Sequence, residues 1–168
     1  DWSALYLFED KGILIEEAVM GVMLFNGTMC IGRLLGNRLG KHLTSKQVVV
    51  GGYLLGSIAM GLIVFLPGHA SMYTYLLLGI SLAMIVPNLF SAMGEQNVIP
   101  MTQAVATSTM LGYMGILMGP ALIGFIAHGT SLTVAFIVLT TLLVVSAGIG
   151  KYAYHLMSKD CGLSEEQI

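Results

Sequence analysis

Charged residues are scarce in this chain. Only 10% of its 168 residues are Asp, Glu, Lys or Arg, whereas a soluble domain has about 25%. So few charges cannot cover a surface that faces water, and the mean hydropathy of +0.85 agrees. The composition therefore predicts an all-α, polytopic membrane protein, with a soluble all-helical protein as the alternative.

The chain also lacks the residues on which several other kinds of protein depend. Two cysteines, Cys30 and Cys161, do not make a disulfide framework, and a net charge of −2 argues against a nucleic-acid partner. There is no Gly-x-Ser-x-Gly elbow, no phosphate-binding loop and no pair of histidines at metal-ligand spacing on one helix face. We therefore expect no enzymatic activity, no metal and no cofactor.

Apolar runs long enough to cross a bilayer, which requires about 20 residues, are abundant instead. The aromatic residues 1–8 resemble the last turns of a sixth helix at the membrane–water interface. Because the chain starts at Asp1 without a charged leader or cleavage site, we expect a fragment and no signal peptide. The predicted units are a helical bundle over residues 1–154 and a polar, partly disordered cytoplasmic tail over residues 155–168. Five full spans are expected at residues 13–35, 47–66, 72–93, 102–127 and 132–154.

Basic residues collect on one side of the membrane if these spans alternate in direction. Only Lys11 falls on the opposite side. Since cytoplasmic loops carry an excess of Lys and Arg, the basic side is predicted to be cytoplasmic, together with the C-terminus. The residues on the basic side are Arg33, Arg38, Lys41, Lys46, Lys151 and Lys159.

Small residues form a stripe along the fourth span. Their steps of four, three and four place them on one helix face, where they would let another helix approach closely. Pro120 follows and bends the helix, so the alternative is a helix that bends or slides during transport. The stripe consists of Ser108, Gly112, Gly115 and Gly119, and a similar face in the second span holds Gly52, Gly56 and Ala59.

Polar residues inside the spans are candidates for a solute cavity, because they are costly in a bilayer and often functional. In the third span, polar residues recur at steps of seven and share a face, since two helical turns cover about 7.2 residues. The alternative is that they only form hydrogen bonds between helices. The fifth span has only Thr and Ser as polar residues and is expected to face lipid. The candidate cavity residues are Asn88, Ser81, Asn26 and Ser91.

The basic turn resembles the loop signature of the major facilitator superfamily, Gly-x-x-x-Asp-Arg-x-Gly followed by two basic residues. Arg38, Gly40 and Lys41 match this signature, and Asn37 stands where the family has an acid. The resemblance implies that these residues, with Arg33, form a loop that takes part in a conformational lock. The run Gly115-x-x-x-Gly119-Pro120 also looks like the fifth helix of a six-helix half.

This resemblance implies the C-terminal half of a transporter, helices seven to twelve, with most of helix seven missing. The partners implied are the missing N-terminal half, the lipid bilayer and a small solute. A bacterial sugar-permease-like or uncharacterised inner-membrane branch is implied, with alternating access and a proton-coupled, sugar-like substrate. The third span would then line the cavity, which favours Asn88 and Ser81 over Asn26. The alternatives are a multidrug or metabolite exporter of the same superfamily and a non-transporting membrane scaffold subunit.

Overall fold

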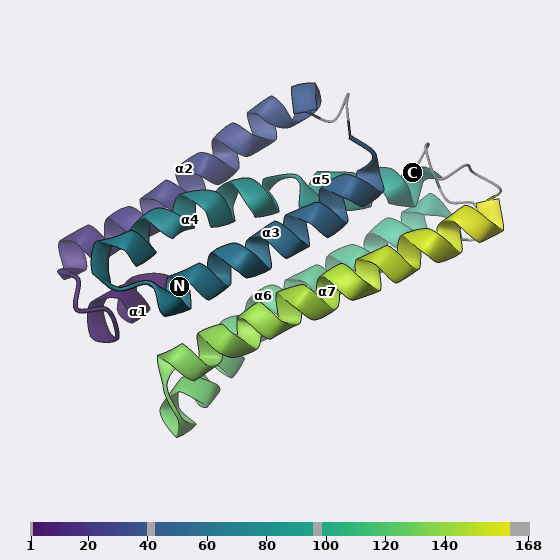
Figure 1. Cartoon of the computed structure of the whole chain (residues 1–168). Coiled ribbons are helices and arrows are strands. Elements are labelled where there is room, and N and C mark those ends of the chain that lie inside the picture. Colours follow the sequence, from purple (N-terminus) through teal and green to yellow (C-terminus); the bar gives the residue numbers. More distant parts are fainter. Residues whose placement is uncertain (1, 40–42, 96–98, 162–168) are drawn as a thin grey trace.

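The computed structural model describes residues 2–39, 43–95 and 99–161, and all regular structure within these ranges is helical (Figure 1). Five helical stretches are long and apolar enough to cross a membrane, which confirms the predicted fold class. The helices are α1 (Ser3–Glu9), α2 (Ile15–Leu39), α3 (Ser45–Phe65), α4 (Gly68–Ala83), α5 (Ile85–Glu95), α6 (Met101–Gly129) and α7 (Leu132–Cys161).

Local sequence signals set where several of these helices begin. The Thr44 side chain accepts a hydrogen bond from the Gln47 backbone, and the Gln47 side chain accepts one from the Thr44 backbone, which together form a capping box for α3. Pro67 and Pro100 stand immediately before α4 and α6, where a proline without an N–H group is tolerated. The predicted turns are therefore present, although α4 starts at Gly68 and not at residue 72.

The third predicted span is not one continuous helix. It divides at Met84 into α4 and α5, because Pro87 has no N–H group and its ring crowds the carbonyl four residues earlier, at Ala83. Helical bonding resumes where the Asn88 N–H donates to the Met84 carbonyl at 3.2 Å. Ser81 in α4 and Asn88 in α5 are seven positions apart and would share a face of a straight helix. The break at Met84 lies between them and interrupts that face.

Glycines allow α2, α3 and α4 to pack closely. A Cβ atom added at Gly79 of α4 would lie 2.5 Å from the Phe25 carbonyl oxygen of α2. One added at Gly52 of α3 would lie 2.7 Å from the Ser81 carbonyl oxygen of α4, and Gly56 and Ala59 of α3 are buried. The small-residue face predicted for the second span is therefore confirmed as a helix-packing face.

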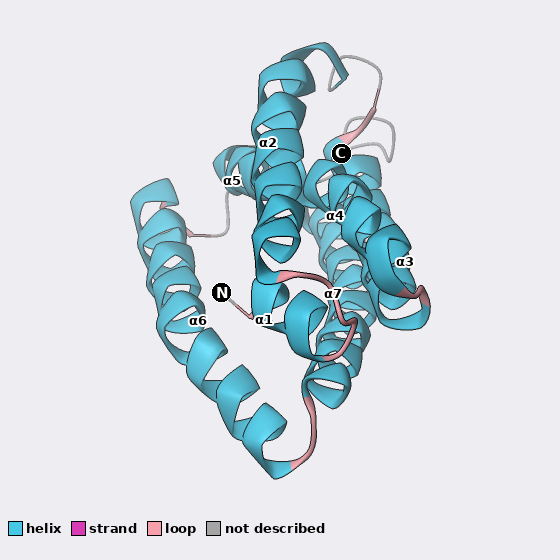
Figure 2. Cartoon of the chain, turned by 90° about the vertical axis from the view of Figure 1, so that its left-hand side faces the viewer, coloured by secondary structure: helices cyan, strands magenta, loops and turns pink. Residues whose placement is uncertain are grey.

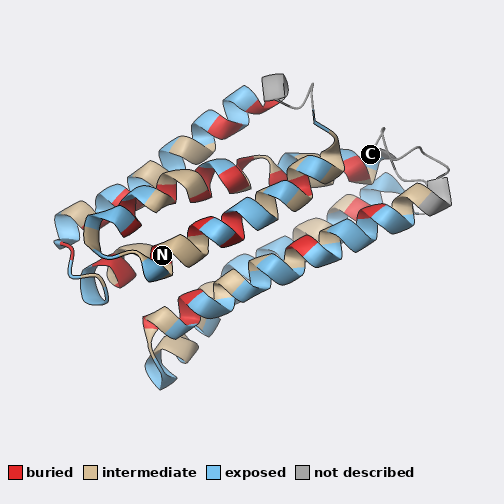
Figure 3. Ribbon diagram, viewed as in Figure 1, coloured by how far each residue is buried: buried red, intermediate tan, exposed pale blue. Residues whose placement is uncertain are grey.

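Helix α6 lies apart from the group formed by α2, α3 and α4 (Figure 2). Its described contacts are mainly with α5 and α7, and Ala104 is its buried residue. Most of its surface is exposed or half-buried (Figure 3). The face of a membrane helix that is left unburied in this way contacts either lipid or another protein segment.

Helix α7 differs from its prediction in length and in packing. It continues through His155 to Cys161, so the first part of the predicted tail is helical, and residues 162–168 lie outside the described part. It packs along α3, and Phe136, Ala147 and Tyr154 are buried. One side of this helix therefore faces protein and not lipid.

Candidate functional site

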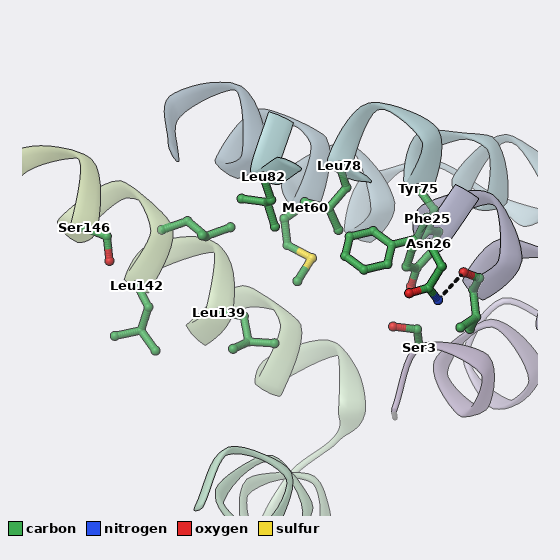
Figure 4. A pocket seen from close by; sticks show the side chains of 12 residues that line it. Ser3, Phe25, Asn26, Met60, Tyr75, Leu78, Leu82, Leu139, Leu142 and Ser146 are labelled. Carbon is green, nitrogen blue, oxygen red and sulfur yellow. Dashed lines mark hydrogen bonds between the residues drawn. The ribbon is translucent and has the colours of Figure 1, made fainter. Parts of the chain in front are cut away.

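A groove with a volume of about 490 Å³ lies between α2, α3, α4 and α7, beside the first residue of α1 (Figure 4). Its lining is mainly apolar, with a few polar side chains at separate points. Sites for small molecules in proteins often combine an apolar lining with a few polar groups. The polar residues are Ser3, Asn26, Tyr75 and Ser146, and the apolar ones are Val22, Phe25, Met60, Leu78, Leu82, Leu139, Leu142 and Leu143.

Asn26 is the one predicted cavity residue among those that line this groove. Its side-chain amide donates to the Val22 carbonyl at 2.8 Å, within α2, and the residue is exposed. The amide group therefore stays close to its own helix while it borders the groove (Figure 4). A change at Asn26 alters the groove surface without removing a hydrogen bond between helices.

Tyr75 is a groove residue that the sequence reasoning missed. The residue is 2% exposed, and its buried hydroxyl interacts with the Ser3 side chain without reaching full hydrogen-bond geometry. A buried tyrosine hydroxyl usually has a partner, because leaving a buried polar group unpaired costs free energy. The sequence signal for Tyr75 is a side chain with a polar hydroxyl inside an apolar run. This signal is weak, because tyrosine is also common in protein cores.

Ser81, Asn88 and Ser91 do not line the groove. The Ser81 hydroxyl donates to the Leu78 carbonyl at 2.8 Å, and the residue is buried against Gly56 of α3. The Asn88 amide donates to the Met84 carbonyl at 2.8 Å in the half-buried first turns of α5, and Ser91 is exposed. Their role in a solute cavity stays a prediction, since a cavity shared with a further protein segment would have walls that this chain does not contain.

The loop motif lies at the end of α2. The Arg33 guanidinium donates to the Met29 sulfur at 3.5 Å, and the residue is exposed. Asn37 and Arg38 belong to the last turn of α2, whereas Gly40 and Lys41 lie outside the described residues. The proposed role of this loop in a conformational lock therefore stays a prediction.

The glycines of the α6 stripe are not packed tightly against another helix in the described structure, and Ser108 and Gly112 border a groove of about 480 Å³ shared with α5. A Cβ atom added at Gly112, Gly115 or Gly119 would meet no other atom within 4 Å. Near the end of this stripe, the Trp2 indole donates to the Pro120 carbonyl at 3.0 Å. The indole also lies close enough to Gly124 that a Cβ atom there would come within 2.9 Å of it. Helix α6 is therefore attached near Pro120, while its glycine face is uncovered.

Replacing Gly115 with leucine tests what covers this face. We expect Gly115→Leu to cause no loss of thermal stability in the 168-residue chain in detergent, because the added side chain meets no neighbour and leucine has a higher intrinsic helix propensity than glycine. The same change in a full-length transporter is expected to lower its membrane abundance or its transport rate, since the added side chain would hold two helices apart. Equal stability and equal transport in both settings would show that the stripe faces lipid.

Polar contacts at the α1 end of the bundle tie its helices together. The Lys11 amine donates to the Val64 and Leu66 carbonyls at 2.6 and 2.9 Å. Thr133 donates to the Asp10 carboxylate at 2.7 Å, and His69 lies 2.9 Å from the Glu17 carboxylate. In the part of the chain that the structure describes, no group of three or more His, Cys, Asp or Glu residues could hold a metal ion.

The chain is similar to membrane transport proteins over most of its length. It is 41% identical over 150 residues, or 88% of the chain, to an uncharacterised MFS-type (major facilitator superfamily) transporter of Yersinia pestis. The chain is related to MFS-type transporters. Identity is 28% with the membrane protein MosC of Rhizobium meliloti over 89% of the chain, and 27% with an uncharacterised transporter of Sinorhizobium fredii over 82% of it. No family model and no solved structure matches the chain.

This MFS-like chain spans 37–38% of the length of these curated relatives. Its five helices are long and apolar enough to cross a membrane, and two of these relatives are named as transporters and one as a membrane protein. The resemblance to the MFS inferred from the loop after the first full span is therefore confirmed, and it is consistent with a C-terminal half.

Proposed function

We propose that this chain is the C-terminal half of a secondary transporter that moves a small solute by alternating access. The observation that carries the proposal is the 41% identity to an MFS-type transporter over 88% of the chain, combined with coverage of 38% of that relative. In such transporters one half rocks against the other around a binding site near the bilayer midplane. This proposal requires the N-terminal half of the same transporter as the partner of this chain.

The distribution of charge supports an orientation for the proposed half. Arg33, Lys46 and Lys151 belong to the helix ends that lie opposite the α1 end, whereas Lys11 lies beside α1 (Figure 1). By the positive-inside rule, the Arg33 end faces the cytoplasm and the C-terminus is cytoplasmic. A bacterial inner membrane suits this orientation and the bacterial origin of the relatives.

The proposed substrate is a small, sugar-like solute, and we place any proton-coupling carboxylate in the N-terminal half. Among the described residues, the acidic side chains at the α1 end, such as Glu16 and Glu17, lie in the first turn of α2 and not deep within a span. Coupling to protons requires an ionisable group within the membrane, and such groups are usually acidic residues or histidine. The spans of this chain provide amides and hydroxyls, which can hydrogen-bond a neutral polar solute.

Substitution of Asn88 in the full-length transporter tests this function. We expect Asn88→Leu to lower solute uptake by roughly tenfold with unchanged membrane abundance, because a lost hydrogen bond to solute is worth about 1–1.5 kcal/mol. The measurement is uptake of labelled sugars in cells or proteoliposomes, alongside quantitation of the protein in the membrane. Asn26→Leu provides the same comparison at the groove.

Thr141→Val is the matched control for these two substitutions. The Thr141 hydroxyl donates to the Ile137 carbonyl of its own helix at 3.0 Å, and the residue is exposed and lies outside the groove. This variant should transport normally. If Asn88→Leu lowers abundance and uptake in parallel, Asn88 has a packing role; if no sugar is taken up even by the unaltered transporter, the proposed substrate class is wrong.

A further inference from the structure

The joint between α4 and α5, residues 81–85, lies between the two helices that flank the basic turn in the chain. Helix α4 packs between α2, which ends before this turn, and α3, which begins after it (Figure 1). Both neighbours present glycines to the joint. Because packed protein interiors leave few voids, a joint enclosed from two sides has its angle set by the surfaces on which it rests.

Helix α2 presents two glycines to this joint. Gly32 and Gly36 are buried and four residues apart, so they share a face of α2. A Cβ atom added at Gly32 would lie 2.7 Å from the Ala83 Cβ, and one added at Gly36 would lie 3.2 Å from the Met84 Cγ and closer still to the Met84 sulfur. Carbon atoms in van der Waals contact are about 3.5–4.0 Å apart. The Met84 side chain therefore fills the space that a side chain at position 36 would need.

Helix α3 meets the other side of the joint in a similar way. A Cβ atom added at Gly52 would lie 2.7 Å from the Ser81 carbonyl oxygen and 3.0 Å from the Ile85 Cγ1. Ile85 is the first residue of α5, is 4% exposed, and belongs to a buried cluster with Val49 of α3 and Tyr154 of α7. The start of α5 is therefore held against α3, while Met84 sets its position relative to α2.

The backbone contributes little to the stiffness of the joint. The Met84 N–H donates to the Leu82 carbonyl, two residues earlier, whereas a helical bond runs to the carbonyl four residues earlier. Pro87 has no N–H group with which to bond the Ala83 carbonyl. The packing of side chains against the glycines of α2 and α3 therefore determines the angle between α4 and α5.

We propose that the seating of Met84 against Gly36 sets the direction of α5, which makes Met84 a positioning residue for Asn88. The Asn88 backbone N–H donates to the Met84 carbonyl at 3.2 Å, and its side-chain amide donates to the same carbonyl at 2.8 Å. A displacement of Met84 therefore carries Asn88 with it. Since Gly36 belongs to the last turns of α2, a movement of the basic turn reaches Asn88 through this contact. The proposal rests on the proposed function only in that Asn88 contacts the solute.

A distance measured across the joint in the full-length transporter tests this proposal. Nitroxide labels on Met20→Cys in α2 and Phe90→Cys in α5, at positions 51% and 38% exposed, report that distance by pulsed electron paramagnetic resonance once the native cysteines are replaced by serine. We expect Gly36→Val to shift the mean distance by about 2 Å or more, because the added methyl groups push Met84 out of its seat. Combining Gly36→Val with Met84→Ala should restore the original distance, since the shorter side chain leaves room for valine.

Gly27→Val is the matched control on the same helix. Gly27 is exposed and a Cβ atom added there would meet nothing within 4 Å, so the same substitution should leave the distance unchanged. Met84→Ala alone overfills nothing and tests the proposal even if Gly36→Val does not fold. We expect it to broaden the distribution of distances, because α5 then lacks the side chain that fixes its direction.

Three results would each overturn the proposal. The first is a shift with Gly36→Val no larger than with Gly27→Val, and the second is a shift that Met84→Ala does not reverse. The third is a distribution as narrow with Met84→Ala alone as in the unaltered protein. The distance is measured without transport, so these results are independent of whether the proposed solute and its contact with Asn88 are correct.

Discussion

Replacing Gly79 by valine is expected to force α2 away from α4 and to lower the free energy of unfolding by about 1–3 kcal/mol, the usual cost of overpacking a tight interface. The nearest atoms to an added Cβ include the Phe25 carbonyl oxygen at 2.5 Å and the Met29 backbone nitrogen at 3.2 Å. Both are backbone atoms, so they cannot move aside as a flexible side chain does. The whole of α2 would have to shift instead.

The measurement is thermal unfolding of the purified protein in detergent, together with its abundance in the membrane. Gly148→Val is the matched control, because Gly148 lies within α7 and an added Cβ there would meet nothing within 4 Å. Both variants change the intrinsic helix propensity equally. If Gly79→Val is as stable as Gly148→Val, the close approach of α2 and α4 is not part of the folded protein.

Replacing Lys11 by methionine is expected to lower the free energy of unfolding by roughly 2 kcal/mol, because two charge-assisted hydrogen bonds are lost. The Lys11 amine donates to the Val64 and Leu66 carbonyls at the end of α3. These carbonyls have no partner further along their own helix, so Lys11 caps α3 from a different segment. The amine also lies 5.5 Å from the centre of the Tyr6 ring, which adds a cation–π contact.

The same unfolding assay measures this effect, with Lys151→Met as control. Lys151 is exposed on α7, so its loss is expected to change stability by less than about 0.5 kcal/mol. Lys11→Arg should recover part of the loss, since a guanidinium can also donate to two carbonyls. A Lys11→Met variant as stable as Lys151→Met would mean that water satisfies the α3 carbonyls equally well.

Helix packing shows where reasoning from sequence succeeded and where it stopped. The sequence directs attention to the glycine stripe of α6, yet a Cβ atom added at Gly112, Gly115 or Gly119 would meet nothing within 4 Å in the described structure. The closest approach to the backbone of another helix is instead at Gly79, which has no neighbouring glycine at helical spacing to mark it. The spacing of glycines within one helix indicates that another helix can pack closely against it. Which helix does so depends on which helices become neighbours in the folded protein.

The residues of the candidate site were also predicted only in part. Asn26 was predicted and borders the groove, but Tyr75 was missed and Ser81 faces α3. Part of the reason is the break at Met84, which separates Ser81 from Asn88 on a helix that the hydropathy pattern shows as unbroken. The groove itself is a property of four helices together and has no counterpart in any one segment.

The sequence by itself determined that this is an all-α membrane protein with five spans, because span length and the cost of burying charge are local properties of the chain. It also determined the resemblance to the MFS, through the loop that ends α2. Only the tertiary structure decided which helix faces are covered, where Pro87 divides the third span, and where Tyr75 and Asn26 meet. Those features depend on how segments far apart in the chain pack in three dimensions, and lipid-facing and protein-facing residues can be equally apolar.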